Sequence, residues 1–171
     1  MKRIFAVLLA VLTLTAVMAG CGSSAPALKM GLGVDAYYDT VSSATEEANG
    51  KISTVVTVAA VLLDAEGKIV ECDLDTLDVA VAFTTAGEAS VANEFKTKYE
   101  QGKDYNMVAY GGAAKEWYDQ AAAFDAICVG KTSSEIAGLV VDGYKGTEEV
   151  ISAGCTIGIA NMAGACAKAA K

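Results

Sequence analysis

The sequence predicts an α+β domain in which an antiparallel sheet carries helices packed mainly on one face. Two observations support this fold class. Segments with a two-residue hydrophobic period come first in the chain, and segments with a helical period follow them. The strand-like and helix-like segments do not alternate, as they would in a parallel sheet. Residues 28–171 are therefore expected to form a single α+β domain.

The first strand is predicted by strict alternation over residues 28–39, which is typical of a half-buried strand. Gly31 and Gly33 fall on its polar side, where we expect a bulge or a close approach of another backbone. Residues 52–63 are β-branched and apolar on both faces, which predicts a central strand.

A turn at residues 64–67 leads into the second arm of a hairpin. Its carboxylates, Glu71, Asp73 and Asp75, alternate with apolar residues and predict one solvated face. Residues 79–83 are expected to add a further short strand, which completes an antiparallel sheet.

The hydrophobic period becomes helical after Gly87. We expect a short helix over residues 91–101 and a longer one over residues 114–129, which Gly130 ends. The longer helix carries an apolar stripe of Trp117, Ala121, Phe124 and Cys128.

Four further elements are predicted toward the C-terminus. Thr132 and Glu135 form a capping box for a brief helix. Residues 140–141 are expected to add an edge strand, Thr147 to cap a helical turn, and residues 157–171 to form a helix of small residues.

The N-terminus predicts where the protein resides. Two basic residues, a short apolar run and small residues precede Cys21, as in a bacterial signal peptide that ends in a lipobox. We expect residues 1–20 to be removed, Cys21 to be lipidated and residues 21–27 to act as a flexible spacer. The protein would then be lipid-anchored in the cell envelope, on the extracytoplasmic side of the membrane. An ordinary signal peptide and an uncleaved anchor are the alternatives.

Composition narrows the classes of function. The chain has no histidine and a net charge of −8, which becomes −10 once Lys2 and Arg3 are removed with residues 1–20. The absence of histidine excludes Ser-His-Asp and Cys-His relays and histidine-ligated zinc. The acidic balance argues against a nucleic-acid partner. A binding protein is therefore favoured over an enzyme.

The spacing of the cysteines in the predicted domain matches no redox or metal-binding motif. Cys72, Cys128, Cys155 and Cys166 contain no CxxC pair and no zinc-like spacing, so no metal site is expected. Four thiols allow three disulfide pairings, and the sequence does not choose among them. Their apolar surroundings favour small, buried hydrophobic side chains.

Two segments resemble a known family. Residues 55–70, a strand–turn–strand, are similar to the opening hairpin of the FMN-binding domain of bacterial extracytoplasmic flavoproteins. Gly154, Cys155 and Thr156 fall on the Gly, Ala and Thr of that family's Ser-Gly-Ala-Thr segment. The resemblance implies an FMN cofactor attached to Thr156 through its phosphate and a role in electron transfer.

The residues themselves are compatible with this implication. A phosphate could lie at a helix N-terminus, where Gly154 and Thr156 let the backbone come close. Trp117 could cover a face of the flavin ring. As alternatives, Thr156 is a plain helix N-cap and Trp117 a core residue.

Two functions remain open. In one, the protein is a lipid-anchored, FMN-binding and redox-associated lipoprotein. In the other, it is a non-enzymatic cell-surface lipoprotein that binds a small molecule or an envelope protein without flavin.

Overall fold

The computed structural model describes residues 27–91 and 94–171. Its main sheet is antiparallel and four-stranded, in the order β1-β2-β3-β4. The strands are β1 (Lys29–Ser42), β2 (Gly50–Leu63), β3 (Ile69–Phe83) and β4 (Ala89–Val91). The predicted signal peptide and Cys21 lie outside the described residues.

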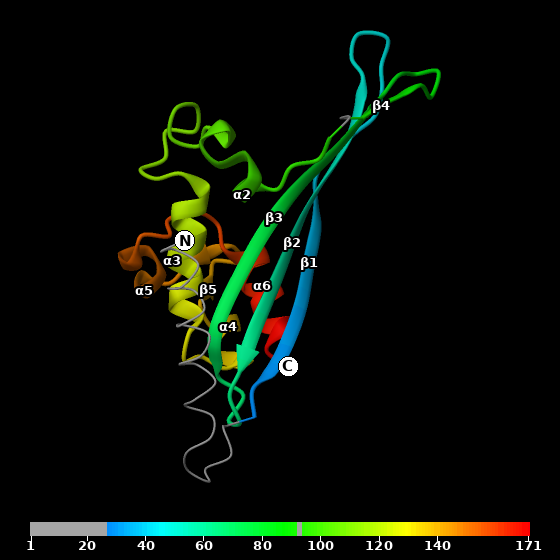
Figure 1. Cartoon of the computed structure of the whole chain (residues 1–171). Coiled ribbons are helices and arrows are strands. Elements are labelled where there is room, and N and C mark those ends of the chain that lie inside the picture. The colour runs from blue at the N-terminus through cyan, green and yellow to red at the C-terminus, as the bar shows by residue number, and fades with distance from the viewer. Residues whose placement is uncertain (1–26, 92–93) are drawn as a thin grey trace, which may run out of the picture.

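The helices lie on one side of this sheet (Figure 1). They are α2 (Lys98–Gln101), the 3₁₀ helix η1 (Gly102–Tyr105), α3 (Trp117–Cys128), α4 (Ser133–Ala137), α5 (Glu148–Ala153) and α6 (Ala160–Ala169). Two short strands, β5 (Val140–Val141) and β6 (Lys145–Gly146), pair with each other in a separate sheet. This architecture confirms the α+β class. No helix in the described part of the chain has both the length and the apolar character needed to cross a membrane.

The β2–β3 hairpin forms as predicted, but β3 is longer than expected. Asp64 Oδ1 accepts hydrogen bonds from the backbone N–H groups of Glu66 and Lys68, at 3.0 and 2.8 Å, and so fixes the turn. The two short strands predicted around residues 70–75 and 79–83 are one continuous strand paired with β2. The carboxylates between them interrupt the hydrophobic pattern without interrupting the strand.

The burial of β1 is the reverse of what its hydrophobic alternation indicates. Met30 and Leu32 are 81% and 70% exposed, on the sheet face opposite the helices of the described residues. Gly31 and Gly33 face α6, and a Cβ at either position would collide with the carbonyl oxygen of Ala169 or Ala165. The predicted close backbone approach at these glycines is therefore confirmed, and it determines which face is covered.

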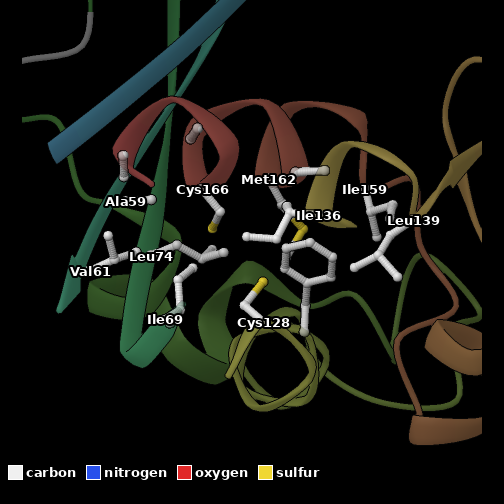
Figure 2. Packing of buried hydrophobic residues seen from close by; sticks show 14 of the residues in the cluster. Ala59, Val61, Ile69, Leu74, Cys128, Ile136, Leu139, Ile159, Met162 and Cys166 are labelled. Carbon is white, nitrogen blue, oxygen red and sulfur yellow. The ribbon is translucent and has the colours of Figure 1, made fainter. Parts of the chain in front are cut away.

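The core lies between the inner face of the sheet and helices α3 and α6 (Figure 2). The predicted stripe on α3 is confirmed, because all four of its side chains are buried. From α6, Met162 and Cys166 point into the same core, and Ala59 and Leu74 close it from the sheet.

Three helix predictions need correction. The helix expected from residue 91 is only α2, because Val91 belongs to β4. Thr147 occupies the N-cap position of α5 but makes no capping hydrogen bond through its side chain. The last helix starts at Ala160 rather than at residue 157, with Ile159 at its N-cap. The capping box of Thr132 and Glu135 is confirmed.

The reversed burial of β1 predicts a large loss of stability for one substitution and almost none for its neighbour. Gly33→Ala should lower the free energy of unfolding by about 1–3 kcal/mol, because the added methyl group pushes against α6. Leu32→Ala, on the open face, should change it by less than about 0.5 kcal/mol. Urea unfolding of both variants measures the two values, and a larger cost for Leu32→Ala would contradict this assignment of the faces.

Candidate functional site

The inner face of the sheet becomes polar beyond the N-terminus of α6. Thr57 and Thr76 lie opposite each other on β2 and β3, both fully buried, with their hydroxyl oxygens 2.8 Å apart. The side-chain amide of Asn161, in the first turn of α6, donates to Thr57 Oγ1 at 2.6 Å. These hydrogen bonds satisfy the buried hydroxyls and fix the start of α6 against the sheet.

Two cavities adjoin here, and Tyr37 lines both of them; we refer to them together as the inner-face groove. One, of about 400 Å³, is lined by Asp35, Tyr37, Tyr144, Gly158, Ala160 and Asn161. The other, of about 370 Å³, is lined by Tyr37, Asp39, Lys51, Ser53, Thr54, Val55, Asp78, Val79, Ala80, Lys98 and Tyr105. Both volumes are typical of small-molecule sites.

Lys98 brings a fixed positive charge to this groove. Only 9% of the residue is exposed, and its ammonium group lies 3.3 Å from Asp78 Oδ2. The same ammonium lies 4.8 Å from the ring centroid of Tyr105 and 5.8 Å from that of Trp117. Burial raises the pKa of the Tyr37 hydroxyl, whereas the Lys98 charge lowers it. The groove therefore combines aromatic side chains with the Lys98 ammonium group and several carboxylates.

Trp117 is placed in the core, which is one of the two roles left open by the sequence. It is 3% exposed, and its ring meets that of Tyr99 edge-to-face, with centroids 5.3 Å apart. It approaches the groove only through Lys98. A stacking role for Trp117 on a flavin would require the ring to be uncovered.

Gly154 and Thr156 lie in the loop between α5 and α6. Gly154 ends α5 with a φ of 103°, and Lys115 Nζ fills the space that a Cβ there would occupy. Thr156 is exposed, and both its backbone N–H and its hydroxyl donate to Gln120 Oε1, at 2.9 and 3.0 Å. Thr156 is not the N-cap of α6, because Ile159 holds that position without a side-chain hydrogen bond. The simple capping role is therefore wrong.

Gln120 ties this loop to the start of α3. It is 1% exposed, and its amide nitrogen donates to the carbonyl oxygen of Lys115 at 3.0 Å. The fold thus brings Gly154, Thr156 and the exposed Lys115 to one place. Gly158, which lines the groove, follows Thr156 by two residues, a Cα separation of at most about 7.6 Å.

Sequence reasoning missed Lys98, Lys115 and Gln120. Gln120 had a usable signal, since it stands three residues after Trp117 and one before Ala121, within the apolar stripe of α3. A glutamine on a buried helix face needs hydrogen-bond partners, and here it finds them in the 154–156 loop. The two lysines carry no comparable signal in the sequence.

A second group of side chains lies in the core, away from the groove. Cys72 of β3, Cys128 of α3 and Cys166 of α6 place their sulfur atoms within 4.8 Å of one another. Figure 2 shows the Cys128 and Cys166 thiols pointing toward each other from facing helices. A hydrogen bond with Cys128, together with burial, raises the pKa of the Cys166 thiol. Burial also raises the pKa of the nearby Asp125 carboxyl, to about 7, although the Cys72 thiol opposes that rise.

Comparison with known proteins gives one informative similarity. The chain is 31% identical over 129 residues to a chlorophenol reductase of Desulfitobacterium hafniense. The similarity covers 66% of this chain and 38% of the reductase, so the chain spans well under half of that relative's length. No family model matches the chain, and no solved structure matches it. Part of this chain is thus similar to part of a redox enzyme.

The tie made by Gln120 can be tested separately from any ligand. Gln120→Ala leaves the Thr156 N–H and the Lys115 carbonyl without their partner, so the free energy of unfolding should fall by about 1–3 kcal/mol. Amide hydrogen exchange over residues 154–159 should accelerate. The control is Ala122→Gln, which places a glutamine on the exposed side of the same helix. Equal exchange rates in the two variants would contradict the tie.

Proposed function

We propose that the protein is a lipid-anchored, extracytoplasmic FMN-binding protein of a redox system. The observation that supports FMN binding most directly is the exposed Thr156 hydroxyl. It lies two residues from Gly154, where Lys115 Nζ lies, and two residues from Gly158, which lines the groove. The similarity to a reductase supports the redox class. The resemblance of the Gly154-Cys155-Thr156 segment to an FMN-attachment segment supports the cofactor.

The phosphate of FMN would contact the loop between α5 and α6. Lys115 supplies a positive charge there. The first N–H groups of α6 have no side-chain cap, and such groups favour anions at a helix N-terminus. Gly154 has no side chain and leaves room for the Lys115 ammonium beside the loop. This arrangement compensates for the absence of arginine in the predicted domain.

The flavin ring would extend from the loop into the inner-face groove. Tyr37 and Tyr144 line the nearer cavity and are about half exposed, so each can offer an aromatic face. Asn161 and Lys98 offer donors for the polar edge of the ring. When bound, the flavin supplies the electron chemistry, and these side chains position it.

Attachment of FMN to Thr156 would be a phosphoryl transfer from a flavin dinucleotide donor. A phosphoester bond from Thr156 Oγ1 to the FMN phosphorus would form, and the phosphoanhydride bond of the donor would break. The hydroxyl proton and a nucleoside monophosphate would leave, so nothing would be oxidised or reduced. The Gln120 oxygen, 3.0 Å from Thr156 Oγ1, orients the hydroxyl for this step.

Protein purified from its native host tests the cofactor. The intact mass should exceed that of the processed and lipidated chain by one FMN less one water, and the solution should show the visible absorbance of oxidised flavin. Thr156→Ala should abolish the added mass, whereas Ser152→Ala, an exposed hydroxyl in the same segment, should keep it. Lys115→Ala should lower the fraction of protein that carries flavin.

A colourless protein from the native host that lacks the added FMN mass would overturn the flavin proposal. The function would then be that of a non-enzymatic surface lipoprotein, with the inner-face groove as the site for a small molecule. Flavin present in the Thr156→Ala variant at the same mass would overturn the attachment site alone.

The lipid anchor is tested at the predicted processing site. Because Cys21 supplies the only thiol there, Cys21→Ser should abolish fatty-acid labelling and leave an unprocessed or mis-sorted precursor. Ser24→Ala, three residues later, should be labelled like the wild type. Labelling that survives Cys21→Ser would show that the anchor is elsewhere.

A further inference from the structure

We propose that Cys72, Cys128, Cys166 and Asp125 bind one thiophilic metal ion, of the Zn²⁺ class, in the core of the domain. The three thiols come from three different elements, β3, α3 and α6, so their meeting is a product of the fold and not of a local motif. This site is separate from the inner-face groove and does not depend on flavin.

The sulfur positions match a single ion. All three sulfur atoms lie within 4.8 Å of one another, and those of Cys72 and Cys166 are 3.5 Å apart. Zn–S bonds of about 2.3 Å place two thiolates on a tetrahedral ion about 3.8 Å apart. Rotations that move each sulfur by less than about 1 Å would therefore complete the coordination.

Asp125 is the proposed fourth ligand, although the group of ligand atoms within 4.8 Å of one another contains only the three thiols. It precedes Cys128 by three residues on α3, so the two side chains share a helix face. Its Oδ1 atom is buried and has no hydrogen-bond partner among residues 27–91 and 94–171. A buried carboxylate oxygen without a partner is rare in folded proteins, and coordination to a metal ion would satisfy it. Carboxylate oxygen is also an ordinary zinc ligand.

The chemistry of binding is simple. Each coordinating thiol releases its proton to solvent, and the thiolates and the carboxylate surround the cation without any oxidant or reductant. Four protein ligands leave no open position, which is the pattern of a structural site. The ion would join both core helices to the sheet at one point.

A cobalt titration of the anaerobically reduced protein tests the site, because Co²⁺ reports zinc-type sites through its visible spectrum. We expect one equivalent of Co²⁺ to bind with thiolate-to-cobalt charge-transfer absorption. One equivalent of Zn²⁺ should displace it, raise the melting temperature and release protons. Asp125→Asn should keep the charge-transfer band, shift the ligand-field bands and weaken binding at least tenfold.

Cysteine variants locate the site. Cys72→Ser and Cys166→Ser should each lose about a third of the charge-transfer intensity at saturating Co²⁺ and should each bind Co²⁺ more weakly. Cys155→Ser is the matched control, because Cys155 is buried and free like the others but stands outside the cluster. It should bind Co²⁺ like the wild type. If a cluster variant fails to fold, the stoichiometry and spectrum of the wild type still test whether the cluster binds the ion. Three thiolates give a larger charge-transfer intensity than one.

Three results would overturn the proposal. One is the absence of thiolate–cobalt absorption in the folded, reduced wild type. Another is loss of binding in Cys155→Ser with retention in Cys72→Ser. The third is native protein in which Cys72 and Cys166 form a disulfide that survives metal addition. A flavin-free protein that binds one Co²⁺ through the cluster would support this proposal while refuting the flavin function.

Discussion

The direct packing of the α6 backbone on β1 is the contact on which the other features depend. Gly31 and Gly33 lack the side chains that would hold the helix away, so the carbonyl groups of Ala165 and Ala169 lie against the strand. Because α6 lies so close to the sheet, Cys166 lies beside Cys72 of β3. It also brings Asn161, in the first turn of the helix, to Thr57, where the polar groove begins.

Hydrophobic alternation located the strands but could not identify the covered face of β1. A two-residue hydrophobic period shows only that the two faces of a strand differ; it does not show which face is covered. Helix α6 consists largely of small residues and packs most closely against glycine. It therefore covers the face of β1 that has fewer apolar side chains. Met30 and Leu32 were left open as a result. The glycines, and not the apolar residues, were the better guide in this strand.

Some residues of the candidate site could be recognised from a short segment of sequence, whereas others are brought together only by the fold. Thr156 and Gly154 could be selected from a short segment because the resemblance is local. Lys98 and Lys115 could not, since only the fold brings them to the groove and to the loop. Cys72 and Cys166 are 94 residues apart, so an analysis of spacing along the chain had no means of grouping them.

The contact between β1 and α6 also fixes the order in which the domain can be completed. Lys168 of α6 donates to the carbonyl oxygen of Val34 on β1 across 134 residues of sequence. The inner face of the first strand thus stays bare until nearly all of the intervening chain has been synthesised. For a chain exported as we propose, the late arrival of α6 would leave this face of the sheet uncovered while the precursor passes through a translocation channel.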